Sequence, residues 1–331
     1  MNRIRLENTE FEGENSVYLL NASSDGPTTL IDTSVRKPET LASLESGLGD
    51  HGCSVEDIAQ VCITHWHTDH AGLAGTVQER SGATVHVHEE DAALVAQRES
   101  AWNDIETRQQ RLLDEWGLPE PIQEPVFRNA VKAGRLDGPT PTVEPFSAGD
   151  TFDCGDYELE AVHLPGHTAG LAGFAFDGED GRELFCGDAL LEAYTPNVGG
   201  ADVRLENPLE AYLDTLSNVV SESYTRAWPG HGDPLDAVSR AREINAHHRE
   251  RAEDVISVLN ENGPTDPWTM GAHLFGELEG IHLLHGPGES YAHLEHLANA
   301  GYVERVGDEY ELIEQPDLDA QFAERMVVNP Q

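Results

Sequence analysis

The chain has 331 residues, of which 38% are hydrophobic, enough for one large domain or for a main domain with a smaller one. Sixty-one acidic residues outnumber 20 basic residues and give a formal net charge of −41. Such a charge disfavours nucleic-acid binding, because phosphates would be repelled. The sequence contains neither an apolar run of about 18 residues nor a signal-peptide pattern at its start, so we expect a cytoplasmic protein without a membrane span.

The acidic residues are spread along the whole chain among ordinary core residues, which argues against disorder. Molar salt shortens the Debye length to about 3 Å and screens the self-repulsion of so acidic a chain. We therefore expect the protein of a salt-loving organism. The cysteines show no CxxC spacing, and we expect buried thiols in a reducing cytoplasm at Cys53, Cys62, Cys154 and Cys186.

Strands and helices alternate over the first 90 residues. Short apolar runs predict strands at 16–20, 28–32, 60–63 and 81–87. Helical spacing predicts helices at 38–48 and 73–81. Further strands are expected at 142–146, 157–164, 171–176 and 183–187, with helices at 208–223 and after 235. This alternation is typical of an α/β fold.

A mostly helical insertion is expected from about residue 89 to 145. Its apolar residues follow helical spacing from Trp102 to Trp116, and the Pro-rich segment 118–125 is expected to break the helix. The next segment, 126–135, contains no acidic residue and places three basic side chains on one face: Arg128, Lys132 and Arg135. This face is either an ordinary solvated surface or a surface that binds an anionic part of a substrate.

The C-terminal part, residues 241–331, is expected to form a helical linker and a small domain of its own. A short helix and a longer one ending at Gly301 precede a β-hairpin that turns at Gly307 and Asp308. Helices followed by such a hairpin predict a winged-helix-like domain. Residues 246–331 hold four basic and 17 acidic residues, so we expect a cap on the substrate side or a homodimer contact instead of a DNA reader.

The segment ITHWHTDHAG, residues 63–72, follows an apolar run and concentrates metal-binding side chains: His65, His67, Asp69 and His70. Neutral imidazole is a usual zinc ligand. The two-residue spacing places His65 and His67 on one side of an extended segment, and a bend beyond them lets the same loop face a second ion. The pattern therefore predicts a metal site for one ion or two.

Three later segments place a further metal-binding side chain on a tight turn after a predicted strand. HLPGHTAG carries His167, LFCGDALL carries Asp188, and WPGHGD carries His231. Glycine allows the backbone turns that direct such side chains toward one point. Together with the first segment, these turns predict a site with two metal ions.

The order H-x-H-x-D-H, Pro-Gly-His, Gly-Asp, Pro-Gly-His over residues 1 to about 240 resembles the signature of the metallo-β-lactamase fold hydrolase superfamily. The resemblance implies an αββα sandwich with a metal pair at one edge of the sheets. It implies that one ion is held by His65, His67 and His167, the other by Asp69, His70 and His231, and that Asp188 bridges them. Residues 1–240 would then be the catalytic domain.

Two further features carry the resemblance. Asp32 in LIDTS matches the aspartate at a strand end in this superfamily, where it would brace the histidine loop; an ordinary strand cap is the alternative. The insertion and the C-terminal unit resemble the glyoxalase II-like, β-lactamase-like subgroup with a C-terminal winged helix.

Two divalent ions, zinc or else manganese or iron, would turn a bound water into hydroxide near neutral pH. We expect this hydroxide to attack a thioester or a related ester or lactone. The catalytic residues would be Asp69, which orients the hydroxide or shuttles a proton, and Asp188. The alternatives are an endoribonuclease or phosphodiesterase of the same fold, an iron-dependent persulfide dioxygenase, and a binding protein with a structural metal. Only 42 residues separate Asp188 from His231, too few for the large inserted domain of RNA-processing relatives.

The loop 193–204 follows Asp188 and is expected to pass near the metals. Tyr194 and Asn197 are therefore candidates for substrate contact, with an ordinary loop role as the alternative. Ten of the other histidines are expected to lie on the surface or to have a structural role; they are His86, His88, His163, His247, His248, His273, His282, His285, His293 and His296.

Overall fold

The computed structural model describes residues 1–7, 13–22, 26–136 and 138–326. Its larger sheet has six strands in chain order: β1 (Asn2–Leu6), β2 (Asn15–Leu20), β3 (Thr29–Ile31), β4 (Gln60–Ile63), β5 (Thr84–His88) and β6 (Val143–Phe146). The first three strands are antiparallel, and β3 to β6 run parallel to one another. The expected strands are present. The structure adds β1, in which Arg3 and Arg5 alternate with apolar residues, so the sequence contains no apolar run there.

The second sheet has five strands in the order β11-β10-β9-β8-β7. They are β7 (Thr151–Asp153), β8 (Glu158–His163), β9 (Ala172–Gly178), β10 (Gly181–Gly187) and β11 (Arg226–Pro229). Strands β7 to β10 are antiparallel, and β11 joins β10 in parallel after a helical crossover. The short strand β7 was not expected from the sequence.

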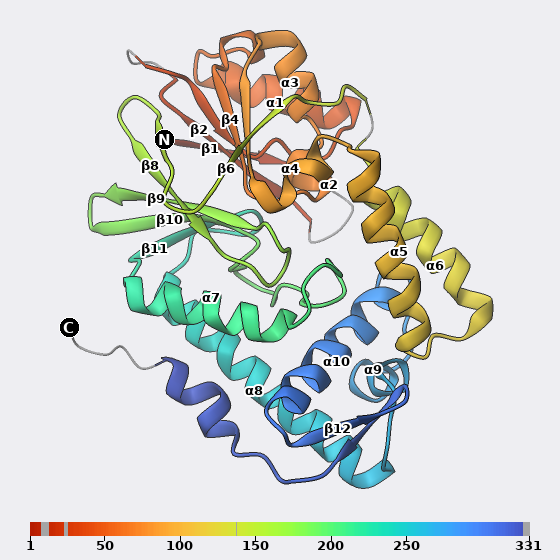
Figure 1. The fold of residues 1–331 in the computed structure, drawn as a ribbon. Coiled ribbons are helices and arrows are strands. Elements are labelled where there is room, and N and C mark those ends of the chain that lie inside the picture. Colours follow the sequence, from red (N-terminus) through yellow and green to blue (C-terminus); the bar gives the residue numbers. More distant parts are fainter. Residues whose placement is uncertain (8–12, 23–25, 137, 327–331) are drawn as a thin grey trace.

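The two sheets pack face to face, and helices cover both outer faces (Figure 1). Buried aromatic residues fill the space between the sheets, among them Tyr18, Phe174 and Phe185. The outer face of the larger sheet is covered by α1 (Pro38–Asp50) and α3 (Ala74–Ser81), and that of the second sheet by α7 (Pro208–Glu222) and α8 (Ala237–Asn262). This is the expected αββα sandwich, since each sheet must bury both of its faces.

The outer helices form for local reasons. Helix α7 begins with Pro208, whose missing N–H is harmless in the first turn, and it buries one apolar stripe that includes Leu209, Leu213 and Leu216. Helix α8 begins where the Asp236 side chain accepts a hydrogen bond from the Ser239 N–H. Helix α3 ends at Gly82, which has a positive φ of 78°.

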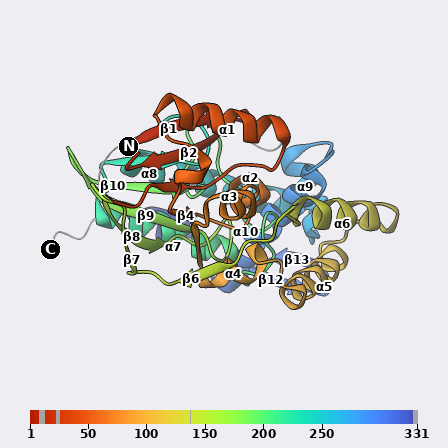
Figure 2. The same cartoon turned by 90° about the horizontal axis from the view of Figure 1, so that it is seen from above.

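The insertion consists of α4 (Glu89–Val95), α5 (Glu99–Glu115) and α6 (Glu120–Gly134), and α5 and α6 project together from one end of the sandwich (Figures 1 and 2). The Pro-rich segment breaks the helix only briefly, so that expectation was too broad. Pro121 occupies the first turn of α6, where proline is tolerated, and Pro125 lies inside the helix.

The C-terminal part contains α9 (Pro267–Phe275), α10 (His282–Asn299) and the hairpin β12 (Val303–Val306) and β13 (Glu309–Leu312), followed by the short turns η2 (Asp319–Ala323) and η3 (Glu324–Met326). The expected order of helices and hairpin is present. These elements share an apolar cluster with α7 and β10, so they pack on the sandwich. The winged-helix assignment, the domain boundary near residue 240 and the dimer contact stay predictions.

Two composition-based expectations can be compared with the structure. All four cysteines are buried and free. Among the described residues, no helix combines the length and the apolarity that a membrane crossing requires.

Candidate metal centre

The predicted metal ligands meet at one edge of the two sheets, because each of them follows the end of a strand. The histidine motif (residues 65–70) lies between β4 and the end of α2 (Thr68–Ala71). His167 follows β8, Asp188 follows β10, and His231 follows β11. Six of the seven side chains are buried, and His67 is partly exposed. Segments more than 160 residues apart in the chain thus converge on one point.

Three histidines form the first cluster. The Nδ1 atom of His67 lies 3.0 Å from His65 Nε2 and 3.1 Å from His167 Nε2. Ring nitrogens at such separations can bind one ion after small shifts.

Asp69, His70 and His231 form the second cluster, and Asp188 lies between the two. Asp69 Oδ2 is 3.3 Å from His231 Nε2 and 3.7 Å from His70 Nε2. Asp188 Oδ2 is 3.4 Å from His70 Nε2 and 3.8 Å from His167 Nε2, so one carboxylate oxygen faces both clusters. Gly230 makes this approach feasible, because a Cβ atom there would lie 2.5 Å from Asp188 Oδ1.

Each histidine of the site has its second ring nitrogen in a hydrogen bond. His67 Nε2, His167 Nδ1 and His231 Nδ1 donate to the carbonyl oxygens of Ala201, Asn197 and Glu14, at 3.2, 2.9 and 3.1 Å. A carbonyl oxygen can only accept, so in the neutral form of each ring the opposite nitrogen carries the lone pair. Such contacts fix the tautomer and the ring orientation that a metal ligand needs.

Asp32 holds the other two histidines from behind. Its carboxylate accepts hydrogen bonds from His70 Nδ1 at 2.9 Å and from the Thr64 hydroxyl at 2.8 Å. Because the Thr64 hydroxyl donates to Asp32, it accepts from His65 Nδ1, which lies 3.0 Å away. In the neutral rings, this arrangement leaves the Nε2 lone pairs of both His65 and His70 facing the site. Asp32 itself has a positive φ of 60°.

The charges of the two clusters differ. Burial, with the neighbouring His167, lowers the pKa of His67 to about 4, and burial also lowers the pKa of His65, so these rings are neutral and free to bind a cation. Burial alone would lower the pKa of His231. The nearby carboxylates of Asp188 and Asp69 outweigh burial and raise this pKa to about 9. Two buried carboxylates thus create a demand for positive charge that a divalent ion satisfies.

Two buried atoms test whether the site fits a metal. Among the described residues, neither His70 Nε2 nor Asp188 Oδ1 has a hydrogen-bond partner of good geometry. Buried polar atoms without a partner are costly, and both atoms lie in the clusters described above. A donor set of imidazole nitrogens and carboxylate oxygens suits zinc, manganese and iron. The residues present therefore fit divalent metal ions.

A buried ion-pair network lies beside the clusters, and no motif in the sequence indicated it. Arg204 pairs with both Asp91 and Asp202, whose side chains are fully buried. Burial raises the pKa of Asp91. At Asp202 Arg204 outweighs burial and lowers the pKa of the carboxyl to about 2.

This network joins three loops of the site. Asp91 accepts a hydrogen bond from the Trp66 N–H at 3.0 Å, inside the histidine motif. Asp202 accepts from the Ala169 N–H at 2.9 Å, in the turn that carries His167. Arg204 connects the two carboxylates across the loop that follows Asp188. The network therefore fixes the loops that hold the first cluster.

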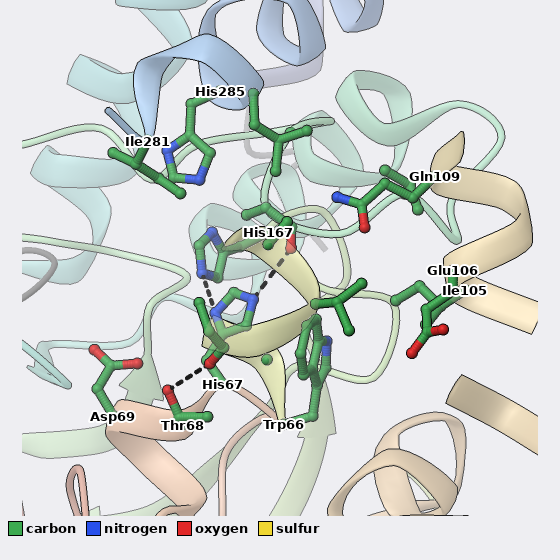
Figure 3. A pocket seen from close by; sticks show the side chains of 18 of the residues that line it. Trp66, His67, Thr68, Asp69, Ile105, Glu106, Gln109, His167, Ile281 and His285 are labelled. Carbon is green, nitrogen blue, oxygen red and sulfur yellow. Dashed lines mark hydrogen bonds between the residues drawn. The ribbon is translucent and has the colours of Figure 1, made fainter. Parts of the chain in front are cut away.

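A pocket that is partly open to solvent lies over the metal clusters. His67, Asp69, His167 and Asp188 line it, and further lining residues come from α5, α6 and α10. Asp69 and the α5 residue Glu106 lie on opposite sides of the pocket (Figure 3). His285 on α10 also lines the pocket, although the sequence placed it among the surface and structural histidines. Burial and the nearby His167 lower its pKa to about 3.

The two residues expected to contact the substrate, Asn197 and Tyr194, lie in different surroundings. Asn197 stands behind His167, and its side-chain oxygen accepts from the Gly200 and Ala201 N–H groups at 3.1 and 2.9 Å. Tyr194 is 63% exposed and lines a neighbouring cavity with Arg251.

The basic residues of α6 are largely engaged elsewhere. Arg128 pairs with Glu124 at 2.7 Å on the exposed surface of the helix. Arg135 pairs with Glu106 at 2.8 Å and lies over the Trp102 ring. Lys132 is exposed. None of the three lines the pocket.

Comparisons with known proteins agree with this geometry. A family model described as the metallo-beta-lactamase superfamily matches residues 11–231. The probable metallo-hydrolase YqjP of Bacillus subtilis is 27% identical over 293 residues, which cover 86% of this chain and 88% of that protein.

Two further relatives match over shorter regions. A hydroxyacylglutathione hydrolase of Vibrio cholerae is 28% identical over 143 residues, covering 42% of this chain and 53% of the relative. The thioesterase pkgB of Emericella nidulans is 26% identical over 226 residues, covering 68% and 48%. This chain thus spans about half the length of each of these two proteins.

Among solved structures, a metallo-beta-lactamase family protein from Thermus thermophilus matches with a TM-score of 0.78 and 29% identity, over 94% of this chain and 98% of that one. A beta-lactamase domain protein from Burkholderia ambifaria matches with a TM-score of 0.76 and 24% identity, over 94% and 92%. Both likenesses extend over nearly the whole chain, including the insertion and the C-terminal elements.

Proposed function

We propose, from the premise that this chain belongs to the metallo-β-lactamase superfamily and is a metal-dependent hydrolase, that it uses two metal ions to hydrolyse an acyl thioester or a related ester. The observation that carries the two-ion proposal is the position of Asp188 Oδ2. It lies 3.4 Å from a nitrogen of one cluster and 3.8 Å from a nitrogen of the other. Zinc is the ion we propose, with manganese and iron as the other ions to test.

Bound divalent ions supply Lewis acidity and lower the pKa of water to near neutrality. The chain's own residues do the rest. Asp69 lines the pocket and also contacts His231, so it is placed to orient the attacking water and to take up a proton. Asp188 holds the two clusters at a fixed separation. Asp32 keeps the His65 and His70 rings in the tautomers that accept a cation.

The acyl part of the proposal is supported by two relatives and by chemistry. The Vibrio cholerae and Emericella nidulans proteins are named a hydroxyacylglutathione hydrolase and a thioesterase. A thiolate leaves readily without being protonated, which favours a thioester as the substrate. We also propose that the protein works in the salt-rich cytoplasm of a halophile, because the net charge of −41 calls for screening.

The test is turnover at molar KCl after reconstitution with zinc, manganese or iron, with acyl thioesters, lactones and single-stranded RNA measured side by side. We expect thioester hydrolysis with two ions bound per chain. Preferred cleavage of RNA would replace this function with a phosphodiesterase. Oxygen consumption with a persulfide and iron would replace it with a dioxygenase.

A further inference from the structure

We propose that the helical side of the pocket binds an apolar acyl chain, so that the substrates are thioesters of aliphatic acids with several methylene groups. This inference rests on the proposed acyl hydrolysis and adds the identity of the acyl group. The helical side is made by α5, α6, α10 and the segment after Asp188, and it faces the metal ligands across the pocket (Figure 3).

Most side chains on this side are apolar although the chain as a whole is strongly acidic, and Trp66 of the histidine motif extends the apolar surface toward the metal ligands. Trp66 and Trp102 stand edge to face with ring centres 5.5 Å apart, and both are buried. Ile105, Val203 and Leu284 come from three different segments and are each less than 10% exposed. A continuous apolar surface of this kind binds hydrocarbon, because polar groups placed there would lose their hydrogen bonds to water.

The two tryptophans are held by the close approach of α6. A Cβ atom at Gly134 would lie 2.9 Å from the Trp102 ring and 3.0 Å from the Trp66 ring, so glycine allows the helix to rest on both rings. Trp66 also belongs to the histidine motif, between His65 and His67. The apolar surface therefore begins directly beside the first metal cluster, where the carbonyl group of a substrate would lie.

The geometry separates the acyl chain from the thiol carrier. The thiol carrier of a thioester is polar or charged, and it would lose hydration if it lay against the tryptophans. Polar side chains do reach the pocket at Glu106 and Gln109, on the α5 side away from Asp69 (Figure 3). Glu106 is already paired with Arg135. The apolar stretch between these polar groups and the metal ligands is thus left for the aliphatic chain.

The first experiment is a series of acetyl, butanoyl, hexanoyl and octanoyl thioesters with one thiol. Burying one methylene changes a binding constant by about fourfold, so kcat/KM is expected to rise by about fourfold per methylene until the slot is filled. An enzyme that hydrolyses all four with equal kcat/KM, or prefers acetyl, would overturn the proposal.

The matched variants are Ala130→Phe and Asn129→Phe on α6. Ala130 lines the pocket, whereas Asn129 is its exposed neighbour outside it. We expect the octanoyl-to-acetyl ratio of kcat/KM to fall at least tenfold in Ala130→Phe and to stay within twofold in Asn129→Phe. Should Ala130→Phe fail to fold, Val131→Ala enlarges the pocket at the next lining residue of α6. We then expect the preferred acyl chain to become longer. An unchanged preference in the folded wall variant contradicts the proposal.

A binding measurement separates this inference from the proposed function. Calorimetry of the whole protein with octanoate and acetate, with and without added zinc, should give much tighter binding of octanoate and a negative heat-capacity change. Octanoate binding without hydrolysis of any thioester would keep the apolar slot and discard the proposed function. Hydrolysis with equal affinities for octanoate and acetate would keep the function and discard the slot.

Discussion

The two sides of the pocket are built in different ways. The metal side consists of charged and polar residues on loops at strand ends, and each histidine ring there has a hydrogen bond on its second nitrogen. The helical side consists mostly of apolar residues from α5, α6 and α10, and a partly buried ion pair of Arg135 with Glu106 joins α5 to the end of α6.

We expect the two sides to have different roles. The metal side fixes the type of reaction, because the loops permit little variation once five rings and two carboxylates must converge. On the function proposed above, the helical side selects the substrate, because its residues would contact the non-reacting part of that substrate. Changes on the metal side should therefore lower kcat, and changes on the helical side should alter substrate preference.

Asp188→Asn tests the metal side with the largest expected effect. The variant keeps the size of the side chain but removes the charge that faces both clusters. We expect kcat to fall about a thousandfold or more, because several kcal/mol of charge stabilisation are lost, and the metal content to fall below two ions per chain. Octanoate binding should stay within threefold.

The control for this variant is Asp104→Asn, at an exposed position on α5. It should keep full activity and full metal content. A variant Asp188→Asn with more than a tenth of the parent activity would mean that this carboxylate does not serve both ions.

Arg204→Met asks how the loops of the metal side are held. The substitution leaves the buried carboxylates of Asp91 and Asp202 without their cation, which is expected to lower the free energy of unfolding by about 3–5 kcal/mol. Urea denaturation at molar KCl measures this value. Replacing both aspartates by asparagine in the same variant should restore most of the stability.

Arg128→Met is the matched control, because Arg128 forms an exposed pair on α6 and should contribute at most about 1 kcal/mol. If Arg204→Met lost no more than this control, the network would have no role in holding the loops.

Low pH should destabilise the packing of α10, which belongs to the helical side, because a histidine pair joins α10 to α8. His248 Nδ1 lies 3.3 Å from His293 Nε2, and both side chains are buried. Burial, aided by the nearby Arg251 and His296, lowers the pKa of His293 to about 3. Because an unfolded histidine titrates near 6.5, the unfolded state binds a proton below that pH and the native state does not until about pH 3. Stability contributed by the neutral ring is therefore lost as the pH falls below 6.5.

Each such histidine adds about 1.4 kcal/mol per pH unit to the pH dependence of unfolding. We expect His293→Phe to reduce the slope of the unfolding free energy between pH 6 and 4 by this amount, measured by urea denaturation. His282→Phe, at an exposed position on the same helix, controls for the loss of a histidine. Equal slopes in His293→Phe and the parent protein would show that this ring titrates normally in the folded state.

The meeting of the histidine and aspartate side chains at one edge of the sheets could be predicted from the sequence because its signals are local. Strand β4 was expected at 60–63 and is present there, and the ligand-bearing turns after the strands are marked by Pro-Gly or Gly-Asp. The αββα layers followed from the same motif order. A local turn next to a buried strand needs little information from the rest of the chain.

The helical side was less predictable because it depends on packing between distant segments. His285 reaches the pocket only through the placement of α10 against the insertion, and no periodicity reports that placement. Arg204 pairs with Asp91 across 113 positions, and neither residue stands in a recognisable pattern. The proline-rich segment was expected to break the helix over its whole length, which was too broad. Proline is tolerated in the first turn of a helix, so such a segment can also begin one.

The smallest expected effect concerns the three basic residues of α6, which the sequence offered as a clamp for an anionic carrier. Arg128 and Arg135 already pair with glutamates. The Arg128 pair is exposed, and exposed pairs are weak and screened by salt. We expect the triple variant Arg128→Ser, Lys132→Ser, Arg135→Ser to change the KM for an acyl-CoA by no more than about threefold at molar KCl. A rise above tenfold for the CoA thioester, without a rise for the same acyl group on a small neutral thiol, would show that the clamp exists and that the helical side also recognises the carrier.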